Sequence, residues 1–285
     1  MSKTVDMGYT EDIINFLEVN VPDLKDIKPI VEDLEQSGHK IDLNSYESTK
    51  VPKLHMATIL GEIDLVKDLI KSGSLVNSKT RKNITPLHLA VFLDRNEIVP
   101  LLLKNGANPN QPSVPYFETP FQMSVIWGKR QVVEMMIDHG ADLKSKIGTG
   151  CSVLHLAIRY RHEDIAIFLI RIGVNVNSID NVSYTPLHLA VLHRKYVIIS
   201  ALLDYEANIN ATNRYKCTPL HFATKNCFRE AMKILLKRGA CLWQKNENGK
   251  IPLESCLTSI GFDYTLEPRA KIARKAFKSF AYNLH

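Results

Sequence analysis

Histidine is the side chain most often recruited for metal binding and proton transfer, and this chain contains ten histidines. Five of them recur at intervals of 33 or 67 residues: His55, His88, His155, His188 and His221. Each lies at least a full repeat from the next, too far to share a metal ion at the ~2.0–2.1 Å bond length of a histidine ligand. The others are His39, His139, His162, His193 and His285, and they show no paired ligand spacing. The histidines therefore predict neither a metal site nor a catalytic group.

The five cysteines do not indicate a metal or redox site either. They are Cys151, Cys217, Cys227, Cys241 and Cys256, and their spacing matches no metal or redox motif, so we expect reduced thiols. Phosphate-binding glycine loops, Gly-x-Ser-x-Gly turns and His-Glu-x-x-His helices are absent from the sequence. We therefore predict a protein that is not an enzyme, with no catalytic residue and no cofactor.

A motif containing the recurrent histidine repeats along the chain. It reads Thr-Pro-Leu-His-x-Ala at 85–90, 185–190 and 218–223, and weaker copies lie at 53–57, 119–124, 153–157 and 251–255. The residue at the proline position falls at 53, 86, 120, 153, 186, 219 and 252, so the interval is 33 or 34 residues. A second signal is in phase with the first: Gly73, Gly106, Gly140, Gly173 and Gly239, with Glu206 in the remaining unit.

These signatures resemble the ankyrin repeat, whose unit has about 33 residues and contains Thr-Pro-Leu-His-x-Ala. The resemblance implies an all-α solenoid of about seven helix-turn-helix units over residues 51–260. The units would begin near residues 51, 84, 118, 151, 184, 217 and 250. It also implies that the repeated His makes a structural hydrogen bond near the start of the first helix of each unit.

Local physical chemistry agrees with this fold. Proline is preset for the first helical turn, and the Thr before it can cap exposed N–H groups. The later Gly permits the left-handed turn that ends the second helix, a turn that Glu206 must make with a side chain attached. A two-helix unit cannot bury its apolar face alone, so stacked neighbours are expected to share one continuous core.

Both ends of such a stack need a polar outer face. Residues 1–50 hold five Lys and eleven Asp or Glu, and we interpret them as a diverged acidic N-terminal capping unit. The alternative is an acidic segment that occupies a basic surface of the same chain. Residues 261–285 are interpreted as a basic amphipathic C-terminal capping segment, with membrane, calmodulin or nuclear targeting as alternatives.

The position of a partner follows from the resemblance. Similar proteins bind through loop tips and the adjoining residues of the first helices, which form a concave face. The corresponding candidates here are Arg81, Lys82, Tyr116, Phe117, Trp127, Arg159, Tyr160, Arg161, Tyr184, His193, Arg194, Lys195, Arg214, Tyr215 and Lys225. Apolar residues extend this stripe in the earlier units, unless they pack against their own loops: Ile59, Leu60, Phe92, Leu93 and Ile126. Aromatic residues beside Arg are typical of interface hot spots.

Residues 51–285 carry a net charge of +12, which favours a protein partner with an acidic surface, held across the third to sixth units. We expect a cytoplasmic or nuclear adaptor or scaffold that is monomeric on its own. The N-terminus is acidic, unlike a secretory signal, and the apolar runs are too short for a membrane span. No small-molecule substrate is expected.

Three alternative functions follow from the same features. A substrate receptor of a ubiquitin ligase would need a docking box after the last repeat, and residues 262–285 contain no convincing copy. An inhibitor of Rel-type transcription factors is suggested by the number of repeats alone. Nucleic-acid binding is suggested by the basic charge with interleaved Tyr and Trp and predicts affinity that falls steeply with salt, but helical ankyrin stacks present no groove-reading element.

Overall fold

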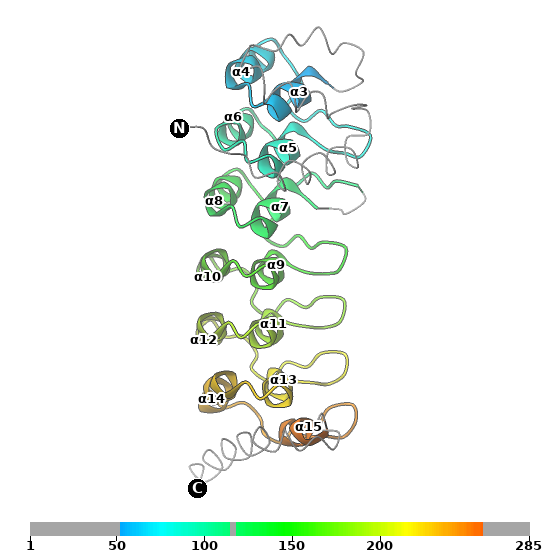
Figure 1. Ribbon diagram of the computed structural model, residues 1–285, viewed down its shortest axis with the longest axis vertical. Helices are drawn as coiled ribbons and strands as arrows, with labels where there is room; N and C mark the ends of the chain where they lie inside the picture. Colours follow the sequence, from blue (N-terminus) through cyan, green and yellow to red (C-terminus); the bar gives the residue numbers. More distant parts are fainter. Residues whose placement is uncertain (1–51, 115–117, 259–285) are drawn as a thin grey trace, which may run out of the picture. The chain divides into compact units, whose positions relative to one another are not determined.

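The computed structural model of the chain describes residues 52–114 and 118–258 (Figure 1). These residues form short α-helices joined by turns and long loops, with one isolated antiparallel bridge between Lys146 and Ser152. The all-α class predicted from the repeat is thereby confirmed. The chain divides into a first block, residues 1–142, and a second block, residues 143–285, and each is described by itself below.

The first block contains three antiparallel helix pairs. They are α3 (Lys53–Leu60) with α4 (Ile63–Lys71), α5 (Pro86–Phe92) with α6 (Ile98–Lys104), and α7 (Pro120–Ile126) with α8 (Arg130–Asp138). The first helix of each pair packs on its equivalent in the next, as does the second, so two helical layers result. We call α3, α5 and α7 the inner helices because the long loops project on their side (Figure 1).

The second block repeats this arrangement. Its pairs are α9 (Val153–Arg159) with α10 (Glu163–Arg171), α11 (Pro186–Leu192) with α12 (Tyr196–Asp204), and α13 (Pro219–Lys225) with α14 (Arg229–Lys237). A further helix, α15 (Pro252–Thr258), packs against α13 in the inner layer. The inner helices of this block are therefore α9, α11, α13 and α15.

The predicted caps begin the inner helices. Thr185 precedes α11 in an extended conformation and Pro186 occupies the first helical position. The side chain of Thr185 accepts a hydrogen bond from the backbone N–H of His188, and the His188 ring accepts one from the backbone N–H of Thr185. Two otherwise unpaired backbone donors are thus satisfied, which typically stabilises a helix by about 1 kcal/mol.

The left-handed turns after the outer helices also follow the sequence signal. Gly173 has a φ of 84° and Glu206, its equivalent in the next unit, has a φ of 62°. The carbonyl of Glu206 accepts a 3.2 Å hydrogen bond from the side-chain amide of Asn177. Glu206 therefore makes the predicted turn with a side chain attached.

The core lies where the two layers meet and where successive units stack. The inner helices are buried almost completely, including Leu87 in α5, Leu154 in α9 and Leu220 in α13. Part of the predicted apolar stripe belongs to this core and is corrected accordingly: Ile59, Leu60 and Leu93 are buried and cannot contact a partner.

Both predicted capping segments, residues 1–50 and 261–285, lie outside the described residues. Within the described part of the chain, no helix has the length and apolar composition needed to cross a membrane.

Candidate partner-binding surface

The repeated histidines connect successive units. In His188 the Nδ1 atom lies 2.9 Å from the Thr185 hydroxyl, and Nε2 lies 3.0 Å from the carbonyl oxygen of Cys217 in the next unit. His88, His155 and His221 make the equivalent contacts to Glu118, Tyr184 and Lys250. Because Nδ1 accepts the Thr185 N–H, the Nε2–H donates to Cys217, which fixes a neutral ring. The structural role implied for these residues is confirmed.

Burial explains the lowered pKa of these rings. Burial lowers the pKa of His55, His88 and His188 to about 4, although the backbone hydrogen bond opposes the shift. Burial also lowers the pKa of His155 and His221. Among the described residues, no group of His, Cys, Asp and Glu is arranged to hold a metal ion.

Cys217, His221 and Asn246 lie close together in the second block, but their geometry is not that of a cysteine nucleophile with its base. Both ring nitrogens of His221 are engaged, with Thr218 and with the carbonyl of Lys250. Burial raises the pKa of the Cys217 thiol, which disfavours the reactive thiolate. Asn246 approaches the Cys217 sulfur at 3.8 Å. These contacts serve the packing of the loops.

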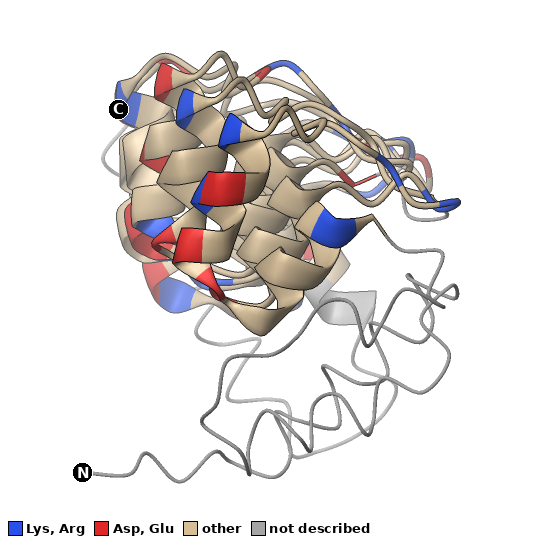
Figure 2. Ribbon diagram, turned by 90° about the horizontal axis from the view of Figure 1, so that it is seen from above, with Lys and Arg blue, Asp and Glu red and all other residues tan. Residues whose placement is uncertain are grey.

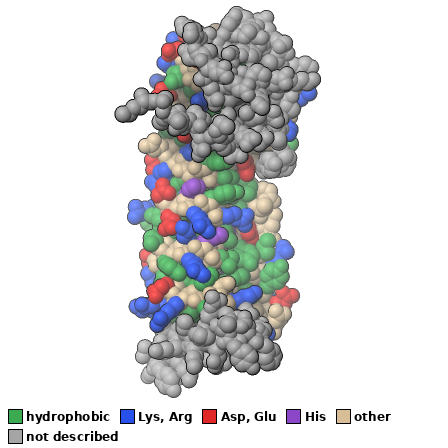
Figure 3. All heavy atoms as spheres, viewed as in Figure 1, with side chains coloured by type: hydrophobic (Ala, Val, Ile, Leu, Met, Phe, Trp, Pro, Cys, Tyr) green, Lys and Arg blue, Asp and Glu red, His purple; other side chains and the backbone are tan. Residues whose placement is uncertain are grey.

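A row of cations follows the C-terminal ends of the inner helices in the second block. We call Arg159, Arg161, Arg194 and Lys225 the basic edge. All four are exposed. Among the described residues, no acidic side chain forms an ion pair with any of them. Figure 3 shows Lys, Arg and His side chains on the described surface, interspersed with acidic and apolar side chains.

The pKa of His193 reflects this concentration of positive charge. Its pKa is lowered first by burial, then by the nearby charges of Arg161, Arg159 and Lys195. A cluster of positive charges attracts anions, so this part of the surface is suited to carboxylates.

The backbone at the basic edge follows the repeat. Arg161 and Arg194 have φ values of 67° and 55°, and the equivalent turn residues of the other units, Gly61, Asp94, Gly128 and Cys227, are also left-handed. A side chain in the left-handed region costs roughly 1–2 kcal/mol. Because Asp94 and Cys227 bear the same cost at the equivalent turn, this conformation is a feature of the repeat and not of the basic edge.

Other predicted residues are used within the chain. Lys195 forms a 2.6 Å ion pair with Glu163. The Arg214 guanidinium donates a 2.8 Å hydrogen bond to the carbonyl of Asn181 and holds neighbouring loop tips together. Tyr160 has 47% of its surface exposed and stands between Arg159 and Arg161.

In the first block, Trp127 is the most prominent candidate. It is 54% exposed, and its ring meets that of Phe92 edge to face with centroids 5.6 Å apart. Phe92 and Ile126 are half-buried, Arg81 is exposed and Lys82 is half-buried at a loop tip. Tyr116 and Phe117 lie outside the described residues. Viewed from above, Lys and Arg predominate among the charged residues at the loop tips (Figure 2).

Charge distinguishes the two blocks. Residues 52–142 contain ten Lys and Arg and nine Asp and Glu, whereas residues 143–258 contain sixteen Lys and Arg and eight Asp and Glu. The basic character of the chain is thus concentrated in the second block, where the basic edge lies.

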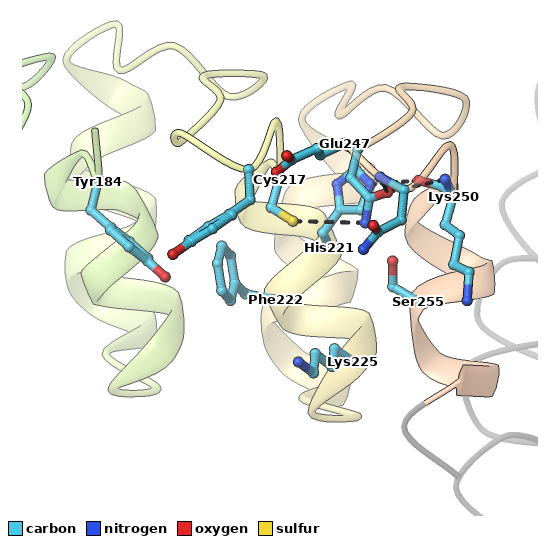
Figure 4. A pocket seen from close by; sticks show the side chains of 11 residues that line it. Tyr184, Cys217, His221, Phe222, Lys225, Glu247, Lys250 and Ser255 are labelled. Atoms are coloured by element: carbon cyan, nitrogen blue, oxygen red, sulfur yellow. Dashed lines mark hydrogen bonds between the residues drawn. The ribbon is translucent and has the colours of Figure 1, made fainter. Parts of the chain in front are cut away.

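The second block also contains a pocket that the sequence did not indicate. Its volume is about 500 Å³, and its walls include Tyr184, Tyr215, Phe222 and Lys225 (Figure 4). Tyr184, Tyr215 and Lys225 were predicted as binding residues, but Phe222 was missed. Its signal was the change from Leu-His-Leu-Ala to Leu-His-Phe-Ala, because the equivalent Leu89 and Leu156 are fully buried and Phe222 is not.

The fold is that of a helical-repeat protein. A sequence model described as ankyrin repeats (3 copies) matches residues 25–113, 113–180 and 172–246. The chain therefore belongs to the ankyrin repeat family, and ankyrin repeats bind other proteins. No curated protein sequence matches the chain.

Solved ankyrin repeat domains share the fold. That of Bcl-3, described as a unique member of the IkappaB protein family, has a TM-score of 0.68 and 23% identity, covering 79% of this chain and 99% of that one. The human ASB11 domain has a TM-score of 0.65 and 24% identity, covering 79% and 98%. A domain from Acinetobacter baumannii AYE has a TM-score of 0.64 and 29% identity, covering 66% and 98%.

Proposed function

We propose that the chain is a non-enzymatic adaptor or scaffold that binds an acidic protein segment along the inner-helix face of its second block. The observation that carries the proposal is the basic edge of Arg159, Arg161, Arg194 and Lys225, which no acidic side chain of the described residues neutralises. An acidic partner would supply the missing negative charge. Nearby Tyr160 adds an exposed aromatic surface of the kind enriched at interfaces.

The helix ends alone do not account for these cations. Positive side chains are favoured at helix C-termini by the helix dipole, and Arg159 and Lys225 occupy such positions. Arg161 and Arg194 lie beyond the helices in strained left-handed turns, where Gly would be less costly. Asp94 and Cys227 occupy the equivalent turns, so the turn itself does not require a cation.

Charge reversal tests the proposal. The triple variant Arg159→Glu, Arg161→Glu, Arg194→Glu should lose the partner recovered by affinity purification and quantitative mass spectrometry. The matched control is Arg171→Glu, Lys233→Glu, Lys237→Glu, which makes the same charge change on exposed positions of the outer helices α10 and α14. Equal recovery by both variants would contradict the proposal.

We further propose a cytoplasmic or nuclear location and a monomeric state. Gel filtration with light scattering tests the second directly, because a dimer would double the 32.3 kDa mass of the chain.

A further inference from the structure

The pocket beside α13 has a rigid aromatic wall. The rings of Tyr184 and Phe222 have centroids 5.5 Å apart at an interplanar angle of 44°. His188 meets both rings edge to face, at 5.5 Å from Tyr184 and 5.8 Å from Phe222. Because buried His188 is itself fixed by hydrogen bonds to Thr185 and Cys217, the wall is held in place before any ligand arrives.

This wall is incompletely covered by the chain. Tyr215 is 50% exposed, and Tyr184 and Phe222 are half-buried. The pocket volume of about 500 Å³ lies within the ~300–1,000 Å³ typical of ligand pockets. Aromatic rings pair favourably with further rings in offset or edge-to-face geometry. The pocket therefore suits an aromatic side chain.

The charged residues around the pocket differ from one end to the other. Lys225 is the last residue of α13 and lies at the end of the pocket away from the loops, whereas Glu247 lies among the loops (Figure 4). The backbone N–H of Glu247 donates a 3.0 Å hydrogen bond to the carbonyl of Tyr215, which fixes the loop position. Lys250 also lines the pocket, so an anionic group is favoured toward Lys225 and Lys250 and disfavoured toward Glu247.

Lys225 is also a member of the basic edge, so the pocket and the edge adjoin. We propose that the pocket receives an aromatic side chain from an acidic peptide segment of the partner, whose neighbouring carboxylates lie along the basic edge. This inference rests on the proposed function and deepens it. The aromatic residue provides the anchor, and the carboxylates orient the segment away from the loops.

The test uses labelled peptide probes and the full chain. Two fluorescein-labelled twelve-residue peptides of Glu, Asp, Ser and Gly differ at one central residue, which is Trp in the first and Ala in the second. Fluorescence anisotropy should show binding about tenfold tighter for the Trp peptide, as expected for a hot-spot aromatic. That ratio should fall toward one in Tyr215→Ala and in the milder Phe222→Leu.

The matched control is Trp243→Ala, which removes a ring that is 72% exposed and does not line the pocket. It should retain the preference for the Trp peptide. Equal affinity of both peptides for the unmodified chain, or a preference that survives both pocket variants, would overturn the pocket assignment. Binding that is lost only in the Arg159, Arg161, Arg194 triple variant would then leave the proposed function standing. No binding of either peptide would overturn both.

A competition experiment separates the partner from the chain's own acidic segment. An unlabelled peptide of residues 10–20 contains Glu11, Asp12 and Glu18 around Phe16. Weak competition, at least tenfold below that of the unlabelled Trp peptide, supports an external partner. Competition as strong as that of the Trp peptide would assign the pocket to this segment and overturn the proposal.

Discussion

The guanidinium carbon of Arg194 lies 4.2 Å from the centre of the Phe228 ring. A cation over an aromatic face at this distance contributes roughly 0.5–1 kcal/mol at an exposed site. The contact holds the Arg194 side chain while leaving it exposed. It thereby offsets part of the cost of the left-handed backbone at Arg194, whose φ is 55°.

Arg161 has the same backbone conformation, and Arg161→Gly should separate stability from binding. Removing the side chain from a φ of 67° should relieve strain and raise the free energy of unfolding by up to about 1 kcal/mol. Binding of an acidic peptide should weaken at the same time because a positive charge is lost. Urea unfolding and anisotropy measure the two effects. A variant that is less stable by more than 1 kcal/mol would show that Arg161 has a structural role.

Glu206→Gly should stabilise the second block. Glu206 has a φ of 62°, where its equivalents are Gly, and its hydrogen bond with Asn177 uses only the backbone carbonyl. The expected gain is about 1 kcal/mol in urea unfolding. Gly173→Ala provides the opposite change at the equivalent position and should destabilise. If both substitutions changed the free energy of unfolding in the same direction, strain at this turn would be contradicted.

The sequence predicted the backbone features because they depend on local residues in register. Thr185, Pro186 and His188 specify the start of α11 within four residues. The surface was predicted less well, since exposure depends on neighbours in other units. Leu60 and Trp127 follow the same motif, yet Leu60 is buried and Trp127 is exposed. The pocket brings together Tyr184, Phe222 and Ser255 from three successive units, which no local pattern encodes.

His188→Ala should destabilise the second block strongly. It leaves the Thr185 N–H and the Cys217 carbonyl without their shared partner, at an expected cost of about 2–4 kcal/mol. His193→Ala removes a half-buried histidine at a turn and should cost less than about 1 kcal/mol. Chemical denaturation of both variants gives the comparison. Similar losses of stability in the two variants would show that the hydrogen bond between His188 and Cys217 contributes little to the free energy of unfolding.

Stability should fall as the pH drops from about 6.5 toward 4. His188 has a pKa near 4 when folded, so the unfolded chain binds more protons within this window. The stability from the neutral ring is complete above pH 6.5, and on the order of 3 kcal/mol is lost by pH 4. His55 and His88 should act similarly in the first block.

A substitution already present in the chain provides the control for this pH effect. Gln122 replaces the repeated His, and its side-chain oxygen accepts the Thr119 N–H at 3.0 Å without titrating. His188→Gln should therefore retain the cap and make the second block's stability less dependent on pH between 6.5 and 4. An unchanged pH profile in urea unfolding would assign the acid sensitivity to other groups.

The position of the partner is tested most directly by site-specific photo-crosslinking in the full chain. One crosslinking amino acid replaces Tyr160, between Arg159 and Arg161 of the basic edge, and another replaces Val197, which is 65% exposed on the outer helix α12. The partner should crosslink from position 160 through an acidic segment, and not from position 197. Crosslinking from position 197 alone, or equally from both, would contradict binding at the inner-helix face.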